Sequence, residues 1–494
     1  MGTPSSGDCY PFQRPRVSVT ALQPRTDPVV LDRYPAPKAK TPEELETSFV
    51  QLFKYYNEAA ARNKEEDCVP EFAECEQKLI KVIRQFRNVK TVYHKFFPQL
   101  VNLKEVFPLM IELLKDDKCG KRLASCTLST FEELTHEDYA VPGQREPVAL
   151  LVKSLVHMGA LEVFVSTLGK FSERDDLRAV QNVAQLLFQS AAAVATIAGG
   201  NHRFQLGQMG TVPVVVNALS SLTSSDEEKT EEEEDLPWTL FGCLFFLLEH
   251  LENKVHFVNA GGVKVMIKLI QDEVLDDYFC GSAIAALDVT KDCPGAASDK
   301  FVNDALELDI AIFPPSIDTI HGSTMHFKAE IEECLISLIE SLTGGIAEMK
   351  KDIFVKKFEE NDGERITWLM EHFIRYSKKV DAVANHLKNK QLDLSELYKE
   401  KLRCGFSTLQ SIAVILGYLW SSEINAKIES ELSRHQIEKK DVQDSLSEYR
   451  DNIGSTGRSV ESTKTVIEDY IASLEVICFD SLNYSSLNAS MALY

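Results

Sequence analysis

The segment from Ala191 to Leu222 constrains the fold most strongly, because its parts recur on both sides of it in the chain. Its turn, Met209-Gly210-Thr211, is followed by the apolar run VPVVVNAL. Similar turns at Met158-Gly159-Ala160 and Ala260-Gly261-Gly262 lead into LEVFVSTL and VKVMIKLI, and the three central glycines lie 51 residues apart. Repetition at a fixed period predicts an array of stacked structural units rather than one compact core.

The apolar residues keep the same phase in each copy of the repeat. In two columns the copies superpose, Val163 with Val214 and Val265, and Val165 with Val216 and Ile267. The β-branched residues at 214–216 would also suit a strand, but the other copies carry Leu, Met and Lys at spacings that suit a helix. We therefore expect a helix after each glycine. A fainter copy without the glycine starts at Leu103.

Each unit makes physical sense as helices in a solenoid. A glycine after a helix accepts the left-handed conformation that ends the helix and turns the chain sharply into the next one. One pair of helices cannot bury its apolar stripe alone, so neighbouring units must stack. The period is slightly longer than the roughly 40 to 47 residues of HEAT and armadillo units. The sequence thus predicts an all-α, armadillo- or HEAT-like, right-handed superhelical solenoid with helical caps.

Composition divides the chain into five regions. Residues 1–40 contain seven prolines and a net charge of +3, which predicts a disordered arm. We expect an N-terminal helical cap at 41–98, armadillo-like repeats at 99–345 and a C-terminal helical cap region at 346–454. Residues 455–494 are expected to form a tail in which a helix is followed by a poorly ordered end.

The charge of the chain indicates what it binds. The formal net charge is −22 at pH 7, so residues 41–494 carry −25. A body this acidic repels nucleic-acid phosphates and attracts basic protein segments. We therefore expect protein partners with basic segments and no direct contact with nucleic acid. The most acidic run, at 224–235, is most simply a solvated loop, and a docking site for a basic partner is the alternative.

Nothing in the sequence predicts membrane association. The longest wholly apolar runs, such as Ile412 to Trp420, are far shorter than the roughly 20 residues that a membrane span needs. The polar, proline-rich start does not have the pattern of a signal peptide. We therefore expect an intracellular protein.

Motifs for catalysis, cofactors and metals are poor. The chain contains no H-E-x-x-H, G-x-S-x-G or G-x-G-x-x-G motif, and its 11 cysteines form no C-x-x-C pair. Asp272 to Asp277 loosely imitates an acidic magnesium motif of helical enzymes, but no second acidic motif faces it. We expect buried free thiols, no cofactor, no metal and no catalytic residues, and a helical enzyme is the third and weakest hypothesis.

Three segments outside the repeats carry a family resemblance. Phe279 to Pro314 reads FCGSAIAALDVTKDCPGAASDKFVNDALELDIAIFP, Phe354 to Tyr376 reads FVKKFEENDGERITWLMEHFIRY, and Tyr449 to Gly454 reads YRDNIG. Together with the array they resemble the beta-catenin-like protein 1 family of nuclear armadillo proteins. The similarity runs from about Pro70 to Gly454 and is patchy, which is typical of a divergent member.

The resemblance implies a function. It implies a non-enzymatic scaffold that is associated with the spliceosome and pre-mRNA splicing in the nucleus. In that family the array binds basic, nuclear-localisation-like segments of its partners, including a Myb-domain splicing factor. The sequence leaves open whether the chain forms a homodimer.

The alternative is a general armadillo adaptor or import-receptor-like protein, with the cytoplasm as its alternative location. The repeated W-x-x-x-N pattern of import adaptors is missing, since Trp238 is followed by Thr239, Leu240 and Phe241, and Gly242 stands where the pattern has Asn.

Two departures from the family pattern stand out. Basic residues of the 1–40 arm are dispersed, whereas family members carry a clustered basic nuclear signal, so import by its own signal is in question. The region between Phe171 and Ala191 is shorter than the family pattern by about one repeat unit. A shorter array would change the length of the groove and hence the range of partners.

In an armadillo unit the third helix lines a concave groove. The third-helix candidates are Leu123 to Leu134, Val180 to Ala198, Thr239 to Leu251, Tyr278 to Val289 and Ile331 to Leu342. Their amides could hold the backbone of an extended peptide while carboxylates meet its Lys or Arg side chains, and aromatic residues would supply anchors. The candidate partner-binding residues are Glu132, Gln181, Asn182, Gln185, Trp238, Glu249, Tyr278, Asp288 and Glu340.

Overall fold

A computed structural model of the chain describes most of the residues after position 40. The described residues are 41–66, 69–91, 94–116, 119–136, 144–170, 179–187, 189, 202–221, 231–271, 277–307, 325–345, 348–387, 394–453 and 458–475. The predicted arm at 1–40, the acidic motif at 272–276 and most of the segment 171–191 lie outside them. Every regular element in the described part of the chain is a helix, which confirms the all-α fold.

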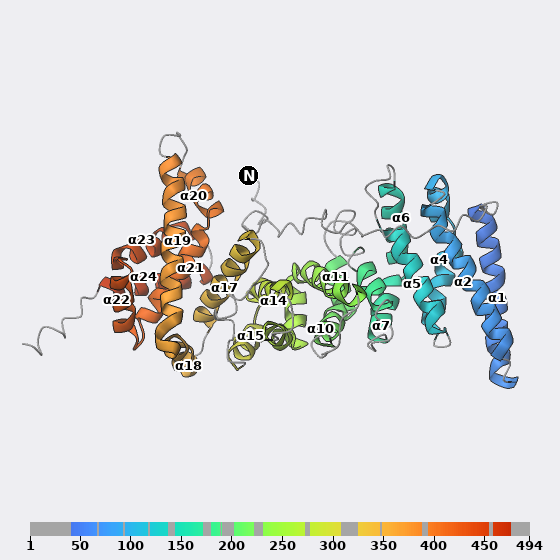
Figure 1. Cartoon of the computed structure of the whole chain (residues 1–494), viewed down its shortest axis with the longest axis horizontal. Helices are drawn as coiled ribbons and strands as arrows, with labels where there is room; N and C mark the ends of the chain where they lie inside the picture. The colour runs from blue at the N-terminus through green and yellow to red at the C-terminus, as the bar shows by residue number, and fades with distance from the viewer. Residues whose placement is uncertain are drawn as a thin grey trace, which may run out of the picture. The chain divides into compact units, whose positions relative to one another are not determined.

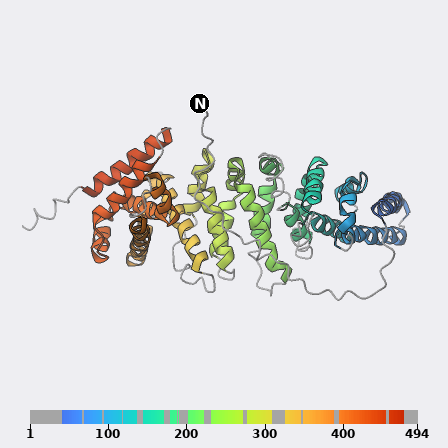
Figure 2. The ribbon, with the colours of Figure 1, turned by 90° about the horizontal axis from the view of Figure 1, so that it is seen from above.

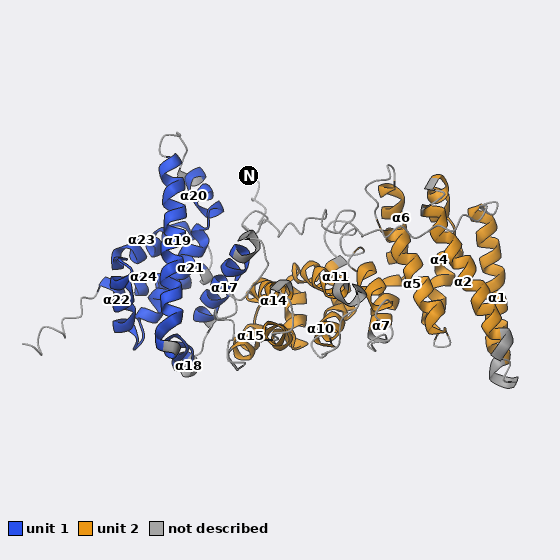
Figure 3. Ribbon diagram, in the orientation of Figure 1, with its two compact units in different colours: residues 1–31, 309–494 blue, residues 32–308 orange. Residues whose placement is uncertain are grey.

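The chain divides into two compact units, shown in orange (unit 2, residues 32–308) and blue (unit 1, residues 1–31 and 309–494) in Figure 3. The helices of unit 2 follow one another in chain order in two perpendicular views (Figures 1 and 2). They are α1 (Pro42–Glu66), α2 (Val69–Thr91), η2 (His94–Phe96), α3 (Phe97–Val101), α4 (Val106–Lys115), α5 (Lys121–Thr135), α6 (Arg145–His157), α7 (Ala160–Lys170), α9 (His202–Gln208), α10 (Thr211–Ser221), α11 (Glu231–Leu248), α12 (Leu251–Asn259), α13 (Gly262–Gln271), α14 (Asp277–Thr290) and α15 (Ala296–Glu307).

Unit 1 is organised around one apolar helix, α21. Its helices are α17 (Met325–Gly345), α18 (Glu348–Glu359), η5 (Glu360–Gly363), α19 (Glu364–Leu387), α20 (Leu394–Arg403), α21 (Phe406–Trp420), α22 (Asn425–Arg434), α23 (Lys439–Asn452) and α24 (Arg458–Glu475). Every residue from Ile412 to Trp420 is buried, and α17, α19, α23 and α24 all pack against α21. One of the longest apolar runs of the sequence therefore lies in the core helix of this unit.

The repeat inferred from the sequence is present in unit 2. Gly159, Gly210 and Gly261 have φ values of 72°, 82° and 78°, and each lies between the end of one helix and the start of the next. These values lie in the left-handed region that glycine adopts without a Cβ clash. The helices after them, α7, α10 and α13, confirm that the β-branched run at 214–216 is helical.

The two apolar columns of the repeat differ in burial. Val165, Val216 and Ile267 are all buried, at 5%, 0% and 0% exposure. In the other column Val163 is buried, whereas Val214 and Val265 are half-buried. Aromatic pairs join successive units, for example the edge-to-face contact of Phe131 on α5 with Phe164 on α7, whose ring centroids are 5.6 Å apart.

Helix α11 begins inside the acidic run that the sequence predicts to be a loop. Its first residue is Glu231, and residues 224–230 lie outside the described part of the chain. Carboxylates in the first turn interact favourably with the positive end of the helix dipole, which explains why 231–235 are helical. Helix α24 lies in the region where the sequence predicts a tail helix.

Candidate partner-binding surface

The predicted third helices of unit 2 lie next to one another. Helix α2 packs on α5, and the helical residues 179–187 come next. The Thr135 hydroxyl of α5 donates to Oε1 of Gln189 at 2.7 Å, and the Thr239 hydroxyl of α11 donates to Oε1 of Gln185 at 3.4 Å. On the far side the Phe241 ring of α11 stacks on Phe279 of α14, 6.5 Å between centroids. Side chains thus link consecutive third helices from α5 to α14.

Glu132 belongs to a polar cluster where α2, α5 and Gln189 meet. Burial, followed by the neighbouring Glu133 carboxylate, raises the pKa of Glu132 to about 7, although Lys90, Arg87 and a hydrogen bond with Gln189 act in the opposite direction. The residue is half-buried, and this environment favours the protonated form of its carboxyl group.

Lys90 fixes one side of this cluster. Its side chain on α2 is only 2% exposed, and Nζ donates to the backbone carbonyls of Glu133 and His136 at the C-terminal end of α5. A cation at this end of a helix also interacts favourably with the helix dipole. Nearby, Arg87 donates to the Ser129 hydroxyl at 3.2 Å.

The three amides predicted on the helical segment 179–187 are all half-buried. Gln185 makes the contact with Thr239 described above. Nδ2 of Asn182 is buried and has no hydrogen-bond partner among the described residues. Gln181 lies one helical turn before Gln185, on the same face.

Helix α11 carries the most accessible of the predicted residues. Trp238 is 38% exposed, and Phe245 further along the helix is half-buried. Glu249 follows directly after the helix and forms an ion pair with Arg203 of α9, whose guanidinium lies 5.7 Å from the centroid of the Phe246 ring. The spacing of Trp238, Phe245 and Glu249 by seven and four residues places them on one helix face.

Asp288, Tyr278 and Glu340 are the remaining three candidates. Asp288 on α14 is only 4% exposed, and it accepts from Nζ of Lys291 at 2.8 Å. Tyr278 lies in the first turn of α14, and its side chain is not among those described. Glu340 lies on α17, which belongs to unit 1. The burial of Asp288 depends on neighbouring packing, which the sequence does not reveal.

Sequence reasoning missed three residues that lie beside the candidates: Lys90, Gln189 and Arg203. The spacing of Gln181, Gln185 and Gln189 by four could have pointed to Gln189, since it repeats one helical turn. No such signal marks Lys90 or Arg203, because each is identified only by the helix end or carboxylate that it contacts.

The described residues include no group of three or more His, Cys, Asp or Glu side chains placed to hold a metal ion. The described cysteines are free thiols, of which Cys243, Cys293 and Cys334 are buried. Within the same residues no single helix is long and apolar enough to cross a membrane. Two bent helix pairs, 145–157 with 160–168 and 396–403 with 406–420, reach that length and apolarity only when taken together.

Helices that stack in chain order, turn at regularly spaced glycines and present polar and aromatic side chains on their third helices define a helical-repeat protein of the armadillo class. A family model described as catenin-beta-like, Arm-motif containing nuclear matches residues 35–199 and 193–447. The chain belongs to this family. The two matched stretches meet next to the segment where the sequence predicts a shortened array.

Relatives and solved structures give more distant matches. Mouse beta-catenin-like protein 1 is 25% identical over 296 residues, which cover 56% of this chain and 51% of the relative. The human protein of the same name is 25% identical over 282 residues, covering 53% and 48%. The chain spans about half the length of the curated relatives it matches. A chain from a structure of the phosphorylation switch between cadherin and beta-catenin aligns with a TM-score of 0.41 at 11% identity, covering 88% of this chain and 85% of that one.

Proposed function

We propose that this chain is a non-enzymatic scaffold that binds basic, nuclear-localisation-like segments of partner proteins. We further propose that it acts in the nucleus, in association with the spliceosome and pre-mRNA splicing. Membership of a family described as nuclear and Arm-motif containing supports this proposal. The relatives named beta-catenin-like protein 1 support it further.

The observation that carries the proposal is the exposed face of α11. Trp238 offers an aromatic ring for the aliphatic stem and charge of a Lys or Arg, and Glu249 offers a carboxylate at the other end of the same face. Gly242 lies between Trp238 and Phe245 and has no side chain to cover them. Cation–π contacts and partly exposed ion pairs are individually modest, so we expect an aromatic anchor and a carboxylate on the same helix face to hold a basic segment together.

The net charge of the chain favours the encounter. At −22 overall, the protein attracts a basic segment before contact, and such steering weakens as salt screens the charges. Glu249 is already paired with Arg203. An incoming Lys or Arg therefore competes with Arg203 for the carboxylate of Glu249, and binding exchanges one ion pair for another.

Binding can be tested directly with a labelled basic peptide and the full chain, followed by fluorescence anisotropy. Trp238→Ala is expected to weaken binding by about fivefold to thirtyfold, since truncation of a central aromatic anchor costs on the order of 1–2 kcal/mol. Phe96→Ala is the matched control, because Phe96 is 39% exposed and lies outside this face. Equal affinities for both variants would contradict the α11 surface.

The cellular part of the proposal needs a separate experiment. Affinity purification of the full chain from its own cells is expected to recover splicing factors, and Trp238→Ala is expected to lose those that carry the basic segment. Recovery of a transport receptor and of cargo in place of splicing factors would instead favour the import-adaptor function. Recovery of neither would overturn the association with splicing.

A further inference from the structure

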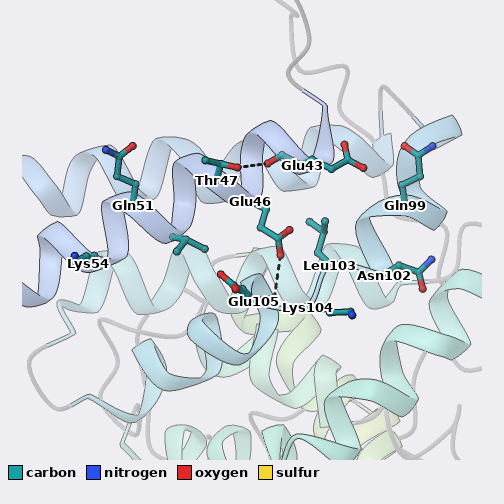
Figure 4. A pocket seen from close by; sticks show the side chains of 11 residues that line it. Glu43, Glu46, Thr47, Gln51, Lys54, Gln99, Asn102, Leu103, Lys104 and Glu105 are labelled. Atoms are coloured by element: carbon teal, nitrogen blue, oxygen red, sulfur yellow. Dashed lines mark hydrogen bonds between the residues drawn. The ribbon is translucent and has the colours of Figure 1, made fainter.

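A second surface lies at the start of unit 2, away from the α11 face. A groove of about 840 Å³ runs between α1 and the connection from α3 to α4 (Figure 4). This volume is within the range of roughly 300–1,000 Å³ that is typical of ligand-binding clefts. None of the residues that line it belongs to the proposed α11 surface.

One face of α1 forms the long wall of the groove. Glu43, Glu46, Val50 and Lys54 all line it, at the three- and four-residue spacing of one helix face. The twelve residues from Glu43 to Lys54 extend about 16 Å along the helix axis. An extended peptide covers that length with about five residues. The groove therefore has the length of a short linear segment.

The groove carries opposite charges along its length. Lys54 lies at one end, Glu46 and Glu105 lie near the middle, and Glu43 lies further from Lys54 (Figure 4). Oε1 of Glu46 accepts from the backbone N–H of Glu105 at 3.1 Å, which ties α1 to the start of α4 and fixes this acidic part. Lys104 offsets one of the three negative charges, so the acidic part keeps an excess of negative charge. The Lys54 side chain is exposed.

Three side-chain amides also line the groove, those of Gln51 on α1, Gln99 on α3 and Asn102 (Figure 4). Nδ2 of Asn102 donates to the carbonyl of Pro98 at 2.8 Å, which leaves its Oδ1 able to accept from a ligand. An amide both donates and accepts, so such side chains suit the alternating N–H and C=O groups of an extended backbone.

We propose that this groove binds an extended segment of a partner protein whose charges are bipolar. Basic side chains of the segment face Glu43 and Glu105, and an acidic side chain about five residues away faces Lys54. The amides of Gln51 and Gln99 form hydrogen bonds with the backbone of the bound segment. This surface selects a mixed-charge segment, whereas the proposed α11 surface selects a basic one.

A charge swap tests the proposal with the full chain. The probes are two labelled peptides that share a Lys-Arg pair and differ five positions away, where one has Glu and the other Lys, each made in both chain directions. The native protein is expected to prefer the Glu peptide by about threefold, which is the range of one exposed ion pair. Lys54→Glu is expected to reverse the preference. The double variant Glu43→Gln, Glu105→Gln is expected to weaken both peptides by about tenfold.

The controls separate this groove from the α11 surface. Glu58→Gln removes a carboxylate from α1 outside the groove and is expected to change neither affinity nor preference. In a Trp238→Ala background the charge preference is expected to persist, whether or not the α11 surface binds basic segments. A Lys54→Glu variant that keeps the native preference would overturn the proposal, as would equal effects of Glu58→Gln and the double variant.

Discussion

The amide of Asn253 on α12 fills the space beside Gly207 on α9, so that a Cβ on Gly207 would overlap the amide oxygen. Asn253 is fully buried, and its Nδ2 donates to the carbonyls of Arg203 and Leu247, both at 2.9 Å. One side chain therefore ties the first turn of α9 and the last turn of α11 to α12. Gly207 is needed here for space rather than for backbone conformation.

Gly207→Ala should destabilise unit 2, because the new methyl group displaces Asn253 and breaks both of its hydrogen bonds. Overpacking and the loss of two buried hydrogen bonds together predict a loss of about 2–4 kcal/mol in the free energy of unfolding. Chemical unfolding followed by circular dichroism measures it. Asn253→Ala makes room for the methyl group, so the double variant should lose less than the sum of the two single variants. Additive losses would contradict the contact.

Gly210 and Gly261 are needed for conformation instead. Both have positive φ, and a Cβ at either would meet no atom within 4 Å. Gly210→Val or Gly261→Val should therefore cost about 1–3 kcal/mol through backbone strain alone. Gly344→Ala is a suitable control, because that position also has open space but no positive φ. Thermal unfolding at unchanged temperature for both valine variants would argue against strain at these turns.

The fold could be predicted from the sequence because its signals are local. Gly159, Gly210 and Gly261 recur at one period, and each apolar stripe keeps its phase relative to its glycine. Both features depend only on residues near in sequence, so they identify the turns and the helices after them. The start of α11 was harder to predict, since an acidic run suits both a solvated loop and the first turn of a helix.

The surface residues could be predicted only in part. Helical spacing places Trp238 and Glu249 on one helix face, but it does not show that Arg203 of another helix pairs with Glu249. Likewise Asp288 is buried by its neighbours rather than by its own sequence context. The groove beside α1 depends on the connection from α3 to α4, more than forty residues away, and no motif marks it.

An indole group adds a hydrogen bond to the packing of α24 on the core helix of unit 1. Nε1 of Trp420 donates to the carbonyl of Ser473 at 3.1 Å. Trp420→Phe removes this hydrogen bond and keeps most of the ring. The loss of about 1 kcal/mol should speed amide exchange in α24 by roughly fivefold. Amides of α17, on another side of α21, are the internal control, and uniform acceleration of both helices would contradict a local role.

Glu132 gives unit 2 a dependence on pH whose sign follows from its environment. Its pKa is raised to about 7 in the folded protein, whereas an unfolded glutamate titrates near 4.5. Below about pH 4.5 the Glu132 carboxyl group is protonated in both states, so its burial carries no penalty for a buried charge in the free energy of unfolding. Between pH 4.5 and 7 the unfolded chain gives up its proton first, so the free energy of unfolding falls as pH rises. Above pH 7 the full penalty of burying the charge is present.

Glu132→Gln should remove that penalty, because the amide is neutral at every pH and keeps an oxygen to accept from Gln189. The variant is expected to gain about 2 kcal/mol over the native protein at pH 8, which allows for the partial exposure of the side chain. Near pH 4.5 the two proteins should unfold at similar denaturant concentrations. The measurement is urea unfolding of both proteins at a series of pH values, with Glu58→Gln as the exposed control on α1. A difference between Glu132→Gln and the native protein that stays constant from pH 4.5 to 8 would show that Glu132 titrates like an exposed carboxyl group.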